Sequence, residues 1–235
     1  MWYKVKRIMM RPNGVEKQVR PTGWQPWANT IAYYPLNSSS TVNDLSWNNK
    51  NLTNYNNVSF WTYQWVDCAS FNGSSQYLGL WAKFTLWNTY TILSWYWHTT
   101  SNVGMVYCQW ASSSLYPAFW AWRPYGNWTK IAMHSGSWWN KTWIVSNNSS
   151  NNWKWVLWVF VLNNGTARIY ENNTQTVSGS LSAPWTWWED FYIWMWRQWY
   201  NYFSGLISNL IIENKARTAQ EISDYYNSTK SKYWL

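Results

Sequence analysis

Short runs of β-branched and aromatic residues, separated by loops rich in Asn and Ser, recur along most of this chain. Short strands at such spacing, with turn residues between them, are typical of an all-β sandwich. The strongest hairpin signal is Asn163-Asn164-Gly165, which follows a long apolar run. We therefore predict an antiparallel two-sheet sandwich. Its expected strands are Thr30–Leu36, Cys68–Phe71, Gln76–Leu80, Tyr90–Trp97, Val103–Gln109, Thr129–His134, Lys154–Leu162, Thr166–Glu171, Gln175–Ser180, Phe191–Trp196 and Phe203–Ile212, and its expected long loops include Asn37–Asn57.

One short helix is predicted near the C-terminus. Thr218 and Glu221 have the spacing of a capping box, in which each side chain bonds the backbone amide of the other residue. Ile222, Tyr225 and Tyr226 then share one face at helical spacing. We expect this face to pack against the edge of the sandwich.

The 235 residues suit a single domain preceded by a short basic segment. Residues 1–22 hold six of the 18 basic residues and are predicted to form a hairpin or arm, and residues 23–235 the main domain. The whole chain has a formal net charge of +9, and this basic segment has the chemistry to contact phosphates or an acidic polymer. A solvated arm is the simpler interpretation, so nucleic acid is an unlikely partner. We find neither an apolar span of about 18 residues for a transmembrane helix nor a signal peptide.

Tryptophan and glycine occur in unusual proportions. The chain has 27 Trp and only 10 Gly, although glycine normally makes up about 7% of residues and turns favour it. Trp47, Trp153 and Trp185 stand in loop sequences where a large ring has little to pack against. We hypothesise that many tryptophans are glycines in the native protein, encoded by UGA in a lineage that translates UGA as glycine. The alternative is a tryptophan-rich carbohydrate-binding surface.

The two cysteines exclude a disulfide-dense mini-domain and a four-cysteine zinc site. Cys68 and Cys108 lie on separate predicted strands and are able to pair only if those strands are adjacent, with Cα atoms within about 7 Å. Buried free thiols are the expectation.

Several motifs, in their order along the chain, resemble the LamG-like, concanavalin A-like jelly-roll domains. The resemblance spans roughly residues 28–228. It rests on Ile31–Leu36, Asn43–Leu52, Ala69–Leu78, Thr91–Trp97, Asn152–Val156, Thr166–Thr174, Phe203–Ile212 and Thr218–Tyr226. Trp47, Trp153, Trp185 and Trp194 stand where this family usually has glycine, whereas Trp155 stands where it usually has tryptophan. The resemblance thus implies a jelly roll and also favours the glycine hypothesis.

An enzymatic site is not apparent. Some glucanases of this fold carry Glu-x-Asp-x-x-Glu, whose carboxylates act as nucleophile and acid/base, and the nine acids here never take that spacing. Glu189 and Asp190 are adjacent and would point to opposite faces of a strand. His98 and His134 lack an evident Ser/Asp partner motif. We predict that the protein is not an enzyme.

A binding site is predicted in two loops that combine arginine, tyrosine and asparagine. The resemblance implies sugar binding on a concave face or in edge loops, through aromatic platforms and polar side chains. The candidate ligand-binding residues are Arg123, Tyr125, Asn127, Arg197, Tyr200 and Asn201. Ordinary polar turns with a packed tyrosine are the competing interpretation. No cofactor is expected except calcium, for which Asp44 is a weak candidate ligand.

The sequence therefore favours a non-catalytic recognition module for glycans or cell-surface polymers, located extracellularly or on a virion surface. A virion or cell-surface structural protein that binds no sugar is the first alternative. A glycan hydrolase of the same fold is the second.

Overall fold

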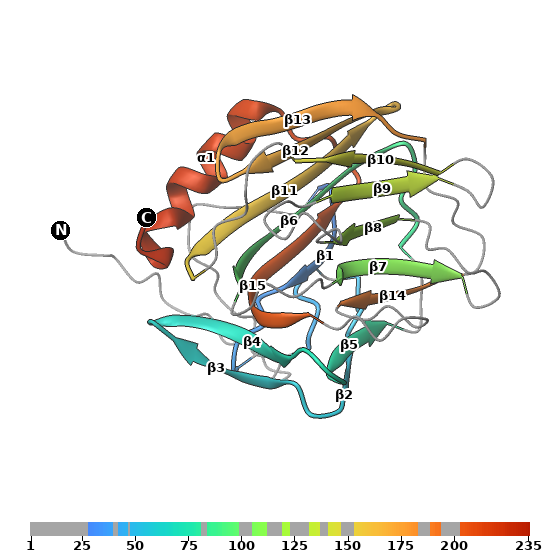
Figure 1. Ribbon diagram of the computed structural model, residues 1–235. Helices are drawn as coiled ribbons and strands as arrows, with labels where there is room; N and C mark the ends of the chain where they lie inside the picture. Colours follow the sequence, from blue (N-terminus) through green and yellow to red (C-terminus); the bar gives the residue numbers. More distant parts are fainter. Residues whose placement is uncertain are drawn as a thin grey trace, which may run out of the picture.

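Two antiparallel sheets pack against each other in the computed structural model of the chain (Figure 1). The structure describes residues 28–39, 42–46, 48–80, 84–98, 105–111, 119–122, 132–136, 141–146, 153–182, 189–193 and 203–235. The predicted all-β, two-sheet sandwich with one short C-terminal helix is thereby confirmed. The basic segment 1–22 lies outside the described residues.

The larger sheet, sheet A, has eight strands within the described part of the chain. Its order is β13-β12-β11-β6-β15-β4-β3, and β1 pairs with β15 beside this path. Its strands are β1 (Thr30–Tyr34), β3 (Ser59–Tyr63), β4 (Val66–Asn72), β6 (Thr89–His98), β11 (Trp155–Asn163), β12 (Thr166–Glu171), β13 (Thr174–Ser180) and β15 (Ser204–Glu213).

The second sheet, sheet B, contains seven strands among the residues described, in the order β10-β9-β8-β7-β14-β5-β2. Its central and outer strands come from distant parts of the sequence, since β5 pairs with both β2 and β14. The strands are β2 (Thr53–Tyr55), β5 (Tyr77–Leu80), β7 (Met105–Ala111), β8 (Phe119–Trp122), β9 (Ala132–Gly136), β10 (Lys141–Val145) and β14 (Glu189–Ile193).

Strand β11 shows how sheet A is buried on both faces. Its residues from Trp155 to Leu162 are all buried. Because side chains alternate along a strand, Val156 and Phe160 enter the core between the sheets, whereas Leu157 and Val159 enter a second apolar cluster on the other face. A continuous apolar run is the expected sequence of a strand covered on both sides.

Helix α1 (Ala219–Thr229) and the following 3-10 turn η1 (Lys230–Tyr233) cover that second face of sheet A (Figure 1). The predicted capping box is present. Ile222 and Tyr225 are buried in the apolar cluster with sheet A residues, and Tyr233 stacks on Trp95 with ring centroids 3.9 Å apart. The prediction that the helix packs on the edge of the sandwich is therefore wrong. Its apolar face lies across the sheet because β6 and β11 present large rings there.

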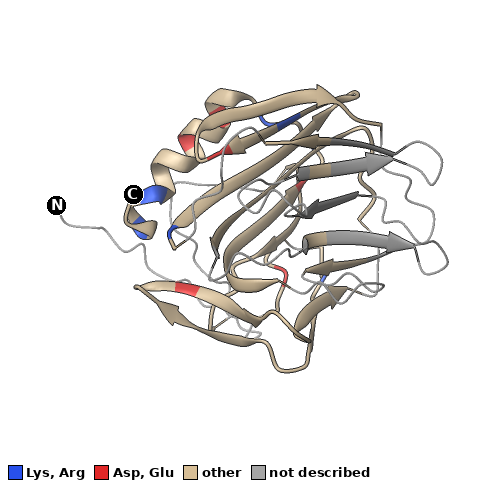
Figure 2. Cartoon of the chain, in the orientation of Figure 1, with Lys and Arg blue, Asp and Glu red and all other residues tan. Residues whose placement is uncertain are grey.

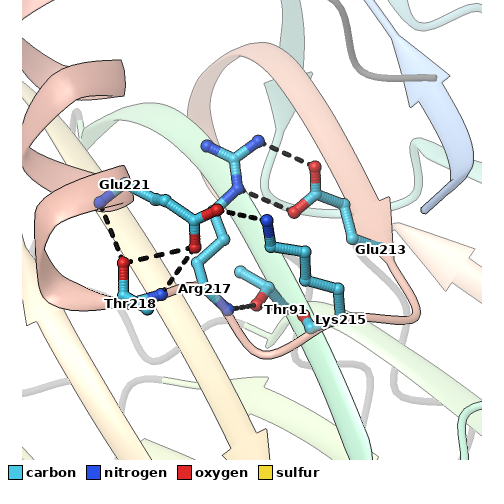
Figure 3. Close-up of polar contacts among 6 residues, drawn as sticks. All are labelled: Thr91, Glu213, Lys215, Arg217, Thr218 and Glu221. Atoms are coloured by element: carbon cyan, nitrogen blue, oxygen red, sulfur yellow. Dashed lines mark hydrogen bonds and ion pairs between the residues drawn. The ribbon is translucent and has the colours of Figure 1, made fainter. Parts of the chain in front are cut away.

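A polar junction fixes the start of α1 to the end of β15 (Figure 3). Arg217 donates from Nε and Nη2 to the two carboxylate oxygens of Glu213, each at 2.7 Å, and both side chains are only 6% exposed. Thr91 Oγ1 accepts from the amide of Arg217 at 2.9 Å and donates to the carbonyl of Lys215 at 2.6 Å. Lys215 also pairs with Glu221. These contacts hold the helix against sheet A.

The local predictions held best at hairpins. Asn164 and Gly165 form the two-residue loop between β11 and β12, as expected. The predicted loop Asn37–Asn57 is wrong in part, because β2 lies within it. Strands β2 and β3 expose most of their residues, so they lack the apolar alternation that marks half-buried strands.

Cys68 is a buried free thiol on β4 of sheet A. Cys108 belongs to β7 of sheet B, so the two residues lie on strands of different sheets. The expectation of a free thiol is confirmed for Cys68. None of the helices in the described residues has the length and apolarity needed to cross a membrane.

Candidate functional site

The six ligand-binding residues predicted from the sequence all lie outside the described residues. They are Arg123, Tyr125, Asn127, Arg197, Tyr200 and Asn201. Their role in binding stays a prediction. The described strands that precede these loops, β8 and β14, belong to sheet B, and the next described strands after them are β9 of sheet B and β15 of sheet A.

Asp44 is described, and its carboxylate organises a loop. Oδ1 accepts from the amides of Tyr33 at 3.0 Å and Ser46 at 2.8 Å. Oδ2 accepts from Ser46 Oγ at 2.9 Å and from the amide of Lys50 at 3.1 Å. Both carboxylate oxygens therefore accept hydrogen bonds from the protein, and these bonds hold the loop in place.

Calcium binding by Asp44 stays a prediction. Calcium usually takes six to eight oxygen ligands. The described residues contain no group of three or more His, Cys, Asp or Glu side chains that could hold a metal ion. The four hydrogen bonds to Asp44 favour a structural role for this carboxylate.

The two sheets differ in what covers their outer faces. α1 and η1 cover the outer face of sheet A, where they share an apolar cluster with its strands. Figure 2 shows several charged residues on and around the helix, within the described part of the chain. Strands β2 and β5 of sheet B carry no charged residue. Both helical elements among the described residues lie on sheet A, and neither covers the outer face of sheet B.

Strand alternation places two tyrosines on this outer face. On β5, Leu78 and Leu80 enter the core between the sheets, so the intervening strand positions face outward. On β14, Phe191 and Ile193 enter the same core and flank Tyr192. Tyr77 and Tyr192 remain only half-buried, and Tyr77 also packs against residues of the core cluster.

With Tyr55 of β2, these residues form the tyrosine cluster (Tyr55, Tyr77 and Tyr192). Tyr55 pairs directly with Tyr77 across the strands, and their rings stack with centroids 4.4 Å apart and planes 11° from parallel. Tyr192 meets Tyr77 edge-on at 6.0 Å. Both geometries are favourable arrangements of aromatic rings. The cluster is a partly exposed aromatic surface built from three strands.

Gly79 provides the floor of the tyrosine cluster. It is the cross-strand partner of Tyr192. A Cβ atom at this position would lie 3.1 Å from Cε2 of Tyr55 and 3.2 Å from Cδ1 of Tyr192. Those distances are tighter than ordinary van der Waals contact, so glycine allows both rings to lie close over β5.

Amide side chains hold the two loops beside the cluster together. Asn56 donates from Nδ2 to the carbonyl of Ser75 at 2.7 Å, and Gln76 donates from Nε2 to the carbonyl of Asn57 at 2.7 Å. Asn56 and Asn57 have φ values of 57° and 58°, which Asn adopts more readily than most residues. The loops therefore position Tyr55 and Tyr77 and expose polar groups at the rim.

Sequence reasoning did not find the tyrosine cluster. Tyr55 lay in a predicted loop, and Tyr77 and Tyr192 lay in predicted strands far apart in the sequence. The alternation Tyr77-Leu78-Gly79-Leu80 was a usable signal for an outward tyrosine. No local sequence pattern predicts the strand register that brings the three rings together, because that register pairs distant segments of the chain.

The sequence matches no protein-family model, and no curated protein matches it. Solved structures, in contrast, resemble the fold. Domain 4 of AbnA, an extracellular GH43 arabinanase from Geobacillus stearothermophilus solved in complex with arabinotriose, has 19% identity and a TM-score of 0.66, covering 83% of this chain and 97% of that domain.

Two toxin domains are similar at lower identity. The binding domain of Paraclostridial Mosquitocidal Protein 1 has 12% identity and a TM-score of 0.70, covering 87% of this chain. The receptor binding domain of botulinum neurotoxin C/D mosaic serotype has 12% identity and a TM-score of 0.69, covering 85%. This chain spans about half of those domains, 53% and 51% respectively. At these identities the likeness establishes the β-sandwich fold.

Proposed function

We propose that the protein is a non-catalytic recognition module that binds glycans on the outer face of sheet B. The observation that carries this proposal is the tyrosine cluster, whose partly exposed rings lie over Gly79. The opposite outer face, on sheet A, is covered by α1 and η1. Sheet B therefore offers the described surface on which a ligand can lie.

The chemistry of the cluster suits a sugar ring. One face of a pyranose or furanose carries C–H groups, which pack against aromatic rings, while its hydroxyls need hydrogen-bonding partners at the rim. Tyr55 and Tyr77 supply the aromatic surface, and the neighbouring loops supply amides and hydroxyls such as those of Asn56 and Ser75. Strands β2 and β5 carry no charged residue, whereas β14 begins with Glu189 and Asp190, so hydroxyl-rich sugars without acidic groups suit this site best.

The structural neighbours support recognition as the function. The arabinanase domain is described as a complex with arabinotriose, and the toxin domains are described as binding domains. We extend this to a LamG-like module that acts outside the cell or on a virion surface. The arabinanase domain belongs to an extracellular enzyme, which agrees with that setting.

The experiment measures binding to arabinotriose and to a panel of immobilised glycans. Tyr77→Ala removes the ring that contacts both other tyrosines. We expect about tenfold weaker binding, since loss of one stacked aromatic contact removes about 0.5–1.5 kcal/mol beyond its area burial. Tyr63→Ala is the matched control, because Tyr63 is a half-buried strand tyrosine of sheet A that also contacts an aromatic ring.

Each outcome separates the candidate functions. Binding that weakens with Tyr77→Ala and not with Tyr63→Ala supports glycan recognition at the cluster. No binding to any glycan, together with ordered self-assembly, would overturn the proposal in favour of a virion or cell-surface structural protein. Release of reducing ends from a bound polysaccharide would instead identify a hydrolase.

A further inference from the structure

Three tryptophans adopt a backbone conformation that large side chains rarely take. Trp65, Trp153 and Trp234 have φ values of 63°, 64° and 63°. This left-handed region costs most L-residues roughly 1–2 kcal/mol, and glycine and asparagine are its usual occupants. Six of the eleven non-glycine residues described with positive φ are indeed Asn, and tryptophan is the next most frequent with three.

The two hairpin loops of sheet A give a direct comparison. Asn164 and Gly165 connect β11 to β12 with φ values of 46° and 86°. Gln64 and Trp65 connect β3 to β4 with φ values of 48° and 63°. A two-residue hairpin loop with positive φ at both positions is a type I′ turn, for which Asn-Gly is the preferred sequence. Trp65 thus occupies the position that Gly165 occupies in the other loop.

Trp234 stands at another position where glycine is favoured. It caps η1 with φ 63° and ψ 34°, and its amide donates to the carbonyl of Lys230. Left-handed residues that end helices in this way are usually glycine. Trp153 lies in the turn that leads into β11. The three positions therefore belong to three unrelated local structures, and each requires a left-handed backbone conformation.

None of the three indoles gains much from burial. The exposed fractions are 82% for Trp65, 65% for Trp153 and 68% for Trp234. An aromatic binding surface would explain exposed rings, but it would not require a left-handed backbone beneath each ring. A glycine requirement explains the left-handed backbone at all three positions. Trp234 Nε1 donates a hydrogen bond to the carbonyl of Gln64 at 2.9 Å, and this contact leaves the Trp234 ring mostly exposed.

Trp155 has the opposite properties, two residues after Trp153. It lies in β11, is 1% exposed and contacts the ring of Tyr233 edge-on at 5.3 Å. Its indole N–H has no partner within the described residues, which costs about 1–3 kcal/mol. Burying a tryptophan ring of 150–250 Å² gains roughly 4–6 kcal/mol, so the aromatic side chain is favoured.

We infer that positions 65, 153 and 234 are glycine in the native protein, through UGA codons read as glycine, and that position 155 is a true tryptophan. The exposed indoles at the three turn positions are then absent from the native surface. The tyrosine cluster contains no tryptophan, so a failure of this inference would not affect the proposed glycan site, and the converse also holds.

Tryptic peptides of the protein purified from its source test the inference. Cleavage after Lys154 puts positions 153 and 155 on separate peptides, 142–154 and 155–168. Cleavage after Lys232 releases the last three residues, with position 234 in the middle. Fragment-ion spectra then read each residue directly, and the genomic codons give an independent readout.

We expect glycine at 65, 153 and 234 with UGA codons, and tryptophan at 155 with UGG. Tryptophan at the three turn positions would overturn the inference. Glycine at 155 would overturn the division between turn and core positions. Protein made from a synthetic gene with UGG at every position is the reference for the tryptophan-containing peptides.

Discussion

The β3–β4 hairpin allows the backbone argument to be tested energetically, because it holds two exposed tryptophans in different conformations. Trp65 is left-handed in the loop, whereas Trp61 lies within β3. We compare Gly with Ala at each position, so that the lost indole is common to both variants. At position 65, the left-handed backbone costs alanine about 1–2 kcal/mol, and the larger unfolded-state entropy of glycine offsets about 0.5–1 kcal/mol of that.

Glycine is therefore expected to be more stable than alanine at position 65 by about 0.5–1 kcal/mol. At Trp61 the order reverses, because glycine in a strand is less stable than alanine by roughly 0.5–1 kcal/mol. Urea unfolding followed by far-UV circular dichroism measures all four variants. With a slope of about 2–3 kcal/mol per molar urea, each difference shifts the midpoint by roughly 0.2–0.5 M.

The sign of the difference is the decisive result. Alanine as stable as glycine at position 65 would refute the left-handed strain on which the glycine inference depends. The same order at both positions would show that the hairpin does not discriminate between them. Equal unfolding slopes in the four variants are needed for the midpoints to be compared.

Four further predictions follow from the described contacts. Gly79→Ala adds a Cβ under two tyrosine rings, so glycan affinity measured by calorimetry should fall while the far-UV spectrum stays unchanged. Glu213→Ala removes the carboxylate that accepts two hydrogen bonds from the buried Arg217 guanidinium, and urea unfolding should show a loss of about 3–5 kcal/mol. Burial raises the pKa of the Cys68 thiol to about 12, so at pH 8 a thiol reagent should label it much more slowly in folded than in unfolded protein, as peptide mapping can show. Asp44→Ala should lower the melting temperature because four hydrogen bonds are lost, and added calcium should not change the melting temperature of the unmodified protein.

The sequence predicted those parts of the fold that depend on neighbouring residues. The strand Thr166–Glu171 has the predicted bounds, and the capping box of Thr218 and Glu221 is present. Both follow from local turn and capping chemistry, which needs no knowledge of distant contacts. The position of the helix on the sheet is not predictable in this way. The helix packs on rings of β6 and β11, which only the assembled sheet brings together.

The tyrosine cluster depended on pairing between distant segments. Tyr77 and Tyr192 lie more than a hundred residues apart and meet because β5 pairs with β14 in one register. A shift of one residue would turn Tyr192 into the core and expose Phe191. Tyr55 lies in a strand of three residues, two of which are exposed. Such a short exposed strand has the sequence pattern of a loop, so Tyr55 could not be assigned to a strand from the sequence.

The sequence of strand β11 indicates which sheet is covered on both faces. Its uninterrupted apolar run implies cover on both faces of sheet A, and the apolar face of α1 is the element able to provide the second cover. Sheet B shows the contrasting pattern on β14, where Phe191 and Ile193 enter the core and Tyr192 stays half-buried. The Tyr192 ring on the outer face of sheet B, above a glycine that makes room for it, is the feature on which the proposed recognition site is based. The proposed recognition site therefore depends on the difference between the outer faces of the two sheets within the described residues.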